Sequence, residues 1–302
     1  MKVQGNETRT LSARQWAPVR GLRIGKGVIR FVRRKPLGAV GAFIILGMAL
    51  MAGLGSNIIF FDPIEWNLPE KLQAPSLRHW LGTDHMGRDI WAQVVMGAQV
   101  SLLVGFLAVA LGDGIGGIVG LVSAWYGGKV DQVIQRIMDA QMSIPTLILA
   151  LAVTASLGQS LVNVILAIAI VEIPRANRVV RSQALAVKEM DFVQAARALG
   201  AGDTRVMLVH ILPQCVAPWL IIASAALGIA ILIEATLSFL GLGVPPPKPT
   251  WGGMLSGPAR NYFVVAPWMA VFPGLALSLV VYGFNLFGDA LRDVLDPRLR
   301  GS

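Results

Sequence analysis

Long apolar segments, separated by short polar stretches, run through most of this 302-residue chain. A helix that crosses the hydrocarbon core of a bilayer needs about 20 predominantly apolar residues. One uncharged run, 142–171, is too long for a single crossing, and Gly158-Gln159-Ser160 marks a turn that divides it. The pattern therefore predicts an all-α polytopic membrane protein with six transmembrane helices, at about 37–61, 98–126, 138–157, 161–179, 211–234 and 264–287.

The polar stretches divide the remainder of the chain. They form a basic N-terminal tail (1–36), a first polar loop (62–97), a connection between the fourth and fifth spans (188–210) and a C-terminal tail (291–302), so the membrane domain covers 37–290. Lysine and arginine gather in the two tails and in the connection. The positive-inside rule therefore places both termini and the connection in the cytoplasm, as expected for a multi-pass protein of the cell inner membrane. We expect the basic tail to lie on anionic membrane lipid.

Composition agrees with a membrane protein and narrows its chemistry. Charged residues make up only 14% of the chain, against about 25% in soluble domains, and the mean hydropathy is +0.64. The net charge is +9, but the positive residues are concentrated in particular loops. Membrane topology therefore explains the charge, and no nucleic-acid partner is expected. Gly127-Gly128-Lys129 lacks the Ser or Thr of a phosphate-binding loop, and the three histidines lack a nucleophile or a metal-ligand pattern. We expect no enzymatic activity, and no cofactor or metal bound by this chain.

Residues 191–214 predict two short helices joined by a tight turn. Asp191 and Gln194 have the spacing of a capping box. Gly200 ends the first helix, Gly202 allows a second bend, and Asp203 is a natural cap for the next helix. The first helix carries an apolar stripe of about three turns, made of Phe192, Ala195, Ala196 and Leu199. Because so short a helix is marginal alone, the stripe predicts docking on another surface.

These residues resemble a known motif. Ala195-Ala196, Gly200 and Leu212-Pro213 are spaced as in the EAA loop of the membrane subunits of ATP-binding-cassette importers, where the loop is the coupling helix that docks on the ATPase subunit. Gln194 stands at the position of the motif's glutamate, so we expect the loop to keep its fold and to lose any salt bridge of that glutamate. The His210-Ile211-Leu212-Pro213 sequence is similar to the dipeptide and oligopeptide branch. A generic amphipathic hairpin between membrane helices is the alternative interpretation.

The resemblance implies a set of residues that couple the chain to an ATPase. This set is Asp191, Phe192, Gln194, Ala195, Ala196, Arg197, Leu199, Gly200 and Asp203.

The first polar loop carries a second motif of that branch. Leu81-Gly82-Thr83-Asp84 followed by Gly87-Arg88-Asp89 resembles the LGTDxxGRD signature of peptide-type permease subunits. Glycines with Asp and Arg at this spacing suit a compact loop held by side-chain hydrogen bonds to the backbone. We favour that role for Asp84 and Arg88 over contact with a substrate or with a substrate-delivering protein. A metal site of His79, Asp84 and His85 is a weak alternative, because no spacing enforces a closed ligand set.

A third run, Ser238–Gly243 with the prolines of 245–249 and Trp251-Gly252, looks like the same branch. The spans also contain three acids, Asp113, Glu172 and Glu234. An intramembrane carboxylate marks a candidate pathway or packing residue, and Glu234 is our best single candidate for a pathway contact. A paired packing role explains Asp113 as well, and a hydrogen-bonded structural role explains Glu234 as well. Glycines around Asp113 predict that the second span packs closely against its neighbours.

Taken together, the motifs imply a type I permease fold and one of two membrane subunits of an ATP-driven importer. The family's other components would be a second permease subunit, two ATPase subunits that bind ATP and Mg²⁺, and an extracytoplasmic binding protein. Di- or oligopeptides are the expected cargo, and nickel chelates, glutathione and oligosaccharides are alternatives within the family. An ion- or proton-coupled secondary transporter that uses the three acids, or a scaffold subunit without transport, remains open at this point.

Overall fold

Helices make up most of the chain that the structure, a computed structural model, describes: residues 32, 33 and 35–295. The described residues from 37 onward form one compact unit, and the predicted basic tail lies almost entirely outside the described residues. In order, the elements are α2 (Pro36–Gly53), α3 (Gly55–Ile58), the 3₁₀ helix η1 (Leu68–Glu70), α4 (Ile90–Tyr126), α5 (Gly128–Met142), α6 (Thr146–Leu157), α7 (Leu161–Lys188), α8 (Asp191–Ala198), α9 (Asp203–Arg205), the π-helix η2 (Val206–Ile211), α10 (Leu212–Phe239), α11 (Trp251–Met254), α12 (Gly257–Asn261) and α13 (Trp268–Leu295).

Among the described residues, four helices or helix runs are long and apolar enough to cross a membrane: α2, α4, the run Asp203–Phe239 that includes α10, and α13. The bent pair α5–α6 makes a fifth if it counts as one span. Helix α7 is not among them, because charged residues, including Glu172, Arg175 and Arg178, interrupt its apolar sequence. The all-α prediction is confirmed, and the count of six spans is not.

Several helix bounds differ from the prediction. The first span was expected at 37–61, but α2 ends at Gly53. Helix α4 begins at Ile90, inside the predicted loop 62–97, because Asp89 caps it: the Asp89 Oδ1 accepts a hydrogen bond from Ala92 N at 2.8 Å. The predicted span 138–157 is not one helix, since α5 and α6 meet at 92° around Pro145. Helix α7 extends past the predicted end of its span at residue 179, and continues through Pro174 to Lys188.

At the C-terminal end, α13 continues to Leu295, past the predicted start of the tail at residue 291. The remaining tail residues, 296–302, lie outside the described part of the chain.

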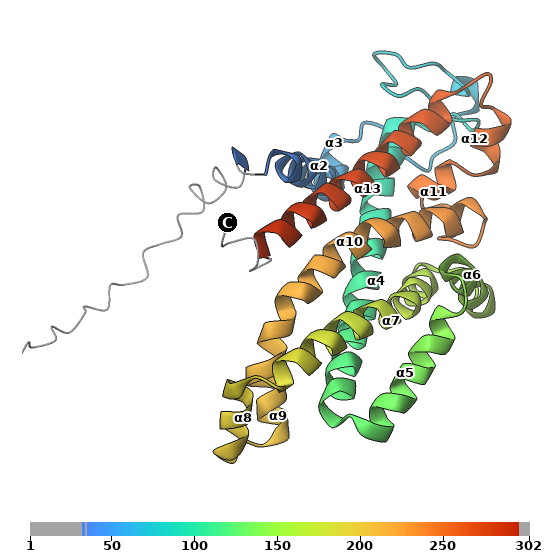
Figure 1. The fold of residues 1–302 in the computed structure, drawn as a ribbon. Coiled ribbons are helices and arrows are strands. Elements are labelled where there is room, and N and C mark those ends of the chain that lie inside the picture. Colours follow the sequence, from blue (N-terminus) through green and yellow to red (C-terminus); the bar gives the residue numbers. More distant parts are fainter. Residues whose placement is uncertain (1–31, 34, 296–302) are drawn as a thin grey trace, which may run out of the picture. The chain divides into compact units, whose positions relative to one another are not determined.

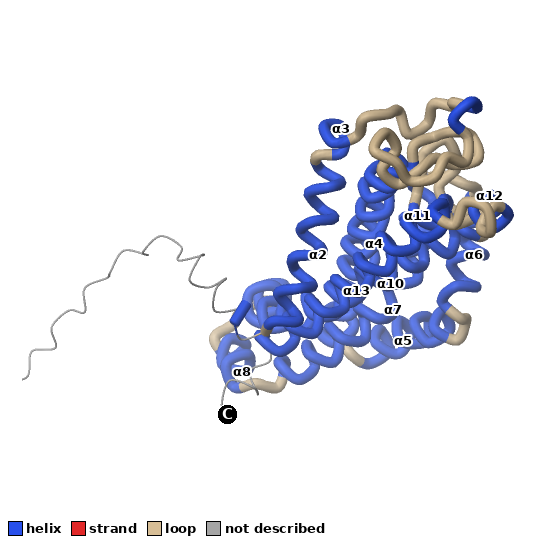
Figure 2. The backbone as a smooth tube through the Cα atoms, turned by 90° about the horizontal axis from the view of Figure 1, so that it is seen from above, coloured by secondary structure: helices blue, strands red, loops and turns tan. Residues whose placement is uncertain are grey.

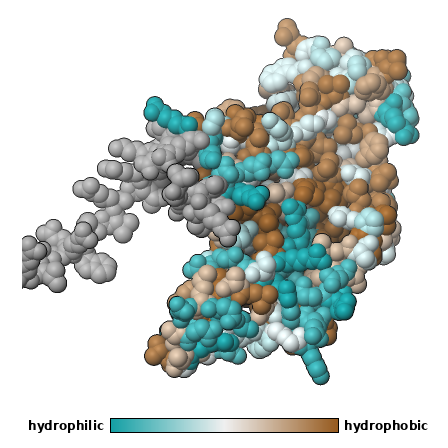
Figure 3. Space-filling model, in the orientation of Figure 1, coloured by the Kyte–Doolittle hydropathy of each residue, from teal (hydrophilic) through white to brown (hydrophobic). Residues whose placement is uncertain are grey.

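Helix α4 is the centre of the arrangement. It packs along α7, with α10 beside both, and α13 lies against α10 (Figure 1). The first polar loop, α11 and α12 gather at one end of α4, whereas α8 and α9 lie at the other end (Figure 1). Figure 2 shows the same separation between the loops beside α12 and helix α8. A hydrophobic cluster of α4, α6, α7 and α10 side chains fills the space between these helices. On the face shown in Figure 3, hydrophilic residues gather toward the end that carries α8, α9 and the start of α5.

Glycines set the close approach of α4 and α7. A methyl group added at Gly112 would come within 2.5 Å of the Ala169 carbonyl oxygen, and one at Gly120 within 2.5 Å of the Asn177 carbonyl oxygen. Gly116, midway between them, faces the Ile173 carbonyl at even closer range. Any side chain on this stripe would push the helices apart, which explains why α4 is rich in glycine.

Candidate functional site

Helix α8 begins differently from the prediction. Its N-cap is Met190, which makes no side-chain cap bond, and Asp191 is the first helical residue. The capping box of Asp191 and Gln194 is therefore not formed. Gln194 instead turns back: its Nε2 donates to the Lys188 carbonyl oxygen at 3.1 Å. Asp191 still places a negative charge on the first turn, where the helix dipole favours it.

The end of α8 follows the sequence prediction in part. Gly200 has a φ of +81°, the left-handed conformation that favours glycine, and its N–H bonds the Arg197 carbonyl at 2.9 Å. Gly202 is the residue before α9, in extended conformation. Asp203 was expected to cap that helix, but it is the first residue of α9 and makes no cap bond, because Gly202 already occupies the cap position.

The apolar stripe of α8 faces away from the rest of the chain. Leu199 is 90% exposed and Phe192 is 43% exposed. Ala195 is exposed as well, and Ala196 is half-buried. Exposed apolar stripes of this kind are typical of surfaces that bind another protein.

A residue outside the predicted stripe holds α8 in place. Val193 is fully buried and packs in a cluster with α7, η2 and the end of α4, including Val187, Val206 and Leu121. The sequence pattern had assigned the helix a single apolar face, so Val193 was missed. Its spacing of three residues from Ala196 was the available signal.

A π-helix follows directly after α9. Val206–Ile211 has this wide, rare geometry and contains half-buried His210. Short π-helical segments are frequent at functional sites. Here the π-helix lies between α9 and the long helix α10.

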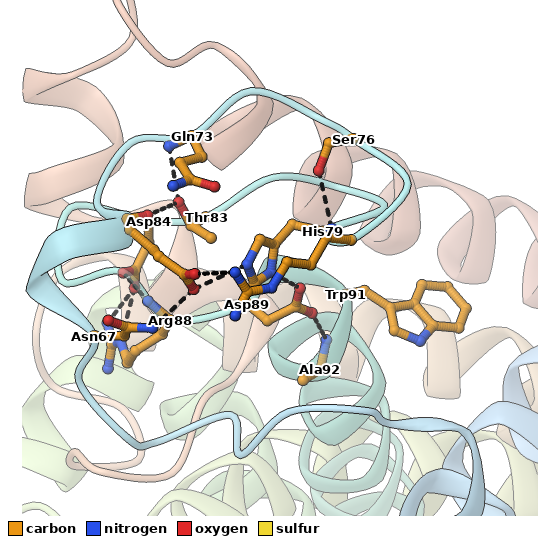
Figure 4. Close-up of polar contacts among 12 residues, drawn as sticks. Asn67, Gln73, Ser76, His79, Thr83, Asp84, Arg88, Asp89, Trp91 and Ala92 are labelled. Carbon is orange, nitrogen blue, oxygen red and sulfur yellow. Dashed lines mark hydrogen bonds and ion pairs between the residues drawn. The ribbon is translucent and has the colours of Figure 1, made fainter.

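The first polar loop is held together by the residues of its motif (Figure 4). The Asp84 Oδ1 accepts hydrogen bonds from the backbone N–H groups of Met86 at 2.8 Å and Arg88 at 3.0 Å. The Asp84 Oδ2 pairs with the Arg88 guanidinium at 2.7 Å and accepts from the buried amide of Gln93 at 3.2 Å. Gly82 and Gly87 have φ values of +81° and +77°. These contacts support the structural role of Asp84 and Arg88.

The other end of the motif joins the loop to α4 and α13. Asp89, which caps α4, also places its Oδ2 2.8 Å from Nδ1 of buried His79, and Nε2 of that histidine lies 3.2 Å from Glu70 (Figure 4). Trp268 Nε1 donates to the Thr83 carbonyl at 3.0 Å. His79 and Asp84 thus have different partners. Within residues 32–33 and 35–295, no group of three or more His, Cys, Asp or Glu is placed to hold a metal ion.

His85 lies next to these hydrogen-bonded residues of the loop, and among the described residues its Nδ1 has no hydrogen-bond partner. Its ring stacks on that of Tyr262, with centroids 6.0 Å apart. Burial lowers the pKa of His85 from its ordinary value of 6.5, against the opposing influence of the Asp84 carboxylate.

The three predicted intramembrane acids are all buried, and they differ in their partners. Glu234 accepts hydrogen bonds from the hydroxyls of Ser101 at 3.0 Å and Ser238 at 2.8 Å. Within the described part of the chain, both oxygens of Asp113 and the Oε2 of Glu172 have no hydrogen-bond partner. Glu234 therefore fits a structural role, whereas Asp113 and Glu172 form a separate polar region between α4 and α7, within electrostatic reach of Arg175.

Arg175 also lines a cavity of about 830 Å³ between α7, α10 and α13. Its other polar lining residues are Gln183, Gln214, Asp289 and Arg292. The sequence prediction did not select Arg175 as a site residue. The available signal was a positive charge inside the predicted span 161–179.

Comparison with known proteins agrees with this architecture. The family described as "Binding-protein-dependent transport system inner membrane component" matches residues 116–301. A putative peptide transport system permease protein of Brucella suis is 43% identical over 271 residues, which cover 90% of each chain. A dipeptide transport system permease protein of Alkalihalophilus pseudofirmus is 43% identical, covering 89% of this chain and 88% of that protein.

A further relative and a solved structure complete the comparison. The glutathione transport system permease protein of Pectobacterium atrosepticum is 41% identical over 90% of both chains. The structure of an inward-facing MetNI methionine ABC transporter matches with a TM-score of 0.57 at 19% identity, covering 68% of this chain and 97% of that chain, and so shows a shared fold. The predicted type I permease fold is confirmed, and the chain belongs to the family of binding-protein-dependent transport system inner membrane components.

Proposed function

We propose that this chain is the membrane-spanning permease subunit of an ATP-driven importer for di- or oligopeptides or a closely related small solute. The observation that carries the proposal is the α8 stripe, where Leu199 is 90% exposed on a helix that Val193 anchors from its other face. A well-anchored helix with an unpartnered apolar face fits a partner protein. Family membership identifies the kind of partner, an ATPase subunit.

The expected complex contains a second permease subunit, two ATPase subunits and an extracytoplasmic binding protein. ATP and Mg²⁺ would be bound by the ATPase subunits, and this chain would supply the pathway and the coupling surface. The positive charges of the 188–210 connection favour a cytoplasmic position for α8, with both termini on the same side. The first polar loop, at the opposite end of α4, then faces the binding protein.

In this complex, transport would follow alternating access. Closure of the ATPase dimer displaces α8, and the attached helices open the pathway to the outside, where the binding protein delivers cargo. Hydrolysis and separation of the ATPase subunits return the helices to the inward-facing arrangement. The relatives named for peptide, dipeptide and glutathione transport favour peptide cargo, since glutathione is itself a tripeptide.

Co-purification tests the coupling surface. We would purify the tagged chain in mild detergent and identify bound proteins by mass spectrometry, for wild type, Leu199→Asp and Ala196→Glu. A charge on the stripe should remove the ATPase subunit and leave the sister permease bound, because Leu199 makes little contact within the chain. Leu77→Asp is the matched control, since Leu77 is 99% exposed in the first polar loop. Retention of the ATPase by both stripe variants would contradict the proposal.

A further inference from the structure

Helices α4, α7 and α8 meet where α8 begins, and contacts join each of the three to the other two. The first link runs from α7 to α4. Lys188, the last residue of α7, donates from Nζ to the carbonyl oxygens of Trp125 at 2.7 Å and Ala124 at 3.2 Å. These carbonyls belong to the last turn of α4, where backbone acceptors lack helical partners and a positive charge is favoured.

The second link runs from α8 back to α7. The carbonyl oxygen of Lys188 accepts the hydrogen bond from Gln194 Nε2 at 3.1 Å. This bond requires a side chain that can donate, which an amide does and an ionised carboxylate does not. Glutamine at the position of the motif's glutamate thus has a physical use in this chain.

The third link runs from α8 to α4. The guanidinium carbon of Arg197 lies 4.3 Å from the centre of the Trp125 ring, and the Lys188 ammonium lies 5.6 Å from it. Both distances fall within the range of favourable cation–π attraction, for which tryptophan is the best partner. Trp125 is only 4% exposed, so its ring is largely shielded from water, whereas Arg197 is exposed.

Because these three contacts join α8 to both α4 and α7, α8 has little freedom to move without them. Val193 of α8 and Val187 of α7 fill the space beneath them, in a cluster that includes Trp125. The glycine stripe of α4 continues the close contact with α7 as far as Gly112. On the other side, α8 reaches α10 through α9 and the π-helix η2.

We propose that Trp125, Lys188 and Gln194 are positioning residues that fasten α8 to α4 and α7, so that a displacement of α8 moves these three helices as one body. The inference rests on the proposed function, because it assigns the route by which ATPase motion enters the membrane domain. Loosening the junction should allow ATP hydrolysis to proceed without moving the helices that carry the pathway.

The test is the number of ATP molecules hydrolysed per cargo molecule imported. The complete complex would be reconstituted in liposomes with its binding protein and a radiolabelled dipeptide as the probe. We expect Trp125→Leu to raise this ratio about tenfold, and Trp125→Phe to stay within about threefold of wild type because it keeps an aromatic face. Gln194→Met, which keeps the length and loses the donor, should raise the ratio several-fold. Lys129→Gln removes an exposed positive charge four residues from Trp125 and is the matched control.

A double-mutant cycle separates the junction from a general loss of structure. If Arg197 acts through the Trp125 ring, adding Arg197→Gln to Trp125→Leu should change the ratio by less than about twofold, although Arg197→Gln alone raises it. Effects that multiply would overturn the proposal. So would Trp125→Leu if it reduced uptake and hydrolysis in equal proportion, since the residue would then only support the fold. A wild-type complex without ATP-dependent peptide uptake would contradict the proposed function and this inference together, whereas normal uptake with an unchanged ratio in Trp125→Leu contradicts the inference alone.

Discussion

Gly116 of α4 faces the carbonyl oxygen of Ile173 in α7 without room for a side chain between them. It lies between Gly112 and Gly120, which face the next carbonyls of α7 along the same stripe. In lipid, where apolar side chains gain nothing by leaving solvent, this close backbone approach is what holds two helices together. The contact between α4 and α7, the most extensive between two helices of the described chain, therefore depends on these glycines.

A larger side chain at Gly116 should weaken that contact. We expect Gly116→Leu to destabilise the protein by about 1–3 kcal/mol or more, the usual cost of overpacking a close contact. The measurement is the thermal unfolding midpoint of the purified chain in detergent. Gly114→Leu is the matched control, because no atom lies within 4 Å of a methyl group placed there. Equal losses in the two variants would show that the stripe does not depend on its glycines.

Removing the Asp84 carboxylate should loosen the first polar loop. Asp84→Ala leaves the half-buried Arg88 guanidinium and the buried Gln93 amide without their acceptor. We expect a cost of about 1–3 kcal/mol, seen as faster protease cleavage within 62–89 while the helices stay protected. Glu65→Ala removes an exposed acid from the same loop and should leave cleavage unchanged. Slow cleavage in both variants would mean that Asp84 does not hold the loop.

His85 should make the same loop sensitive to acid. Burial lowers the pKa of His85 below 6.5, so the folded protein binds this proton less readily than the unfolded chain does. The stabilising contribution is therefore present above about pH 6.5 and is lost as the pH falls through the folded-state pKa. We expect the unfolding midpoint to drop between about pH 7.5 and about pH 5.5, and His85→Gln to reduce that drop. His210→Gln, at the opposite end of the molecule, controls for the loss of a histidine.

Apolar segments, together with the glycine and capping residues between them, predict most of the helices, because length and hydropathy decide where a helix can lie in a membrane. They do not predict the 92° bend between α5 and α6, or the continuation of α7 through Pro174, since both depend on contacts with other helices. The capping box failed for a similar reason. Gln194 donates instead to the Lys188 carbonyl oxygen, which comes within reach only in the folded chain.

The candidate site shows the same division. The stripe of α8 and the Asp84–Arg88 loop could be predicted, because their residues are close in sequence. The sequence could not predict that Glu234 has hydrogen-bond partners that Asp113 lacks among the described residues. Ser101, which donates to Glu234, lies 133 positions away along the chain. The contact of Trp125 with Arg197 also joins residues far apart in sequence, and no local pattern indicates it.

Uptake into proteoliposomes distinguishes transport driven by ATP from transport driven by an ion gradient. The complex would be reconstituted with its binding protein and a radiolabelled dipeptide, once with ATP on the ATPase side and no ion gradient, and once with a proton gradient and no ATP. We expect uptake in the first arrangement, its loss with Leu199→Asp, and no uptake in the second. Uptake driven by the proton gradient alone would rule out an ATP-driven importer and identify Asp113 and Glu172 as the groups to study in a secondary transporter.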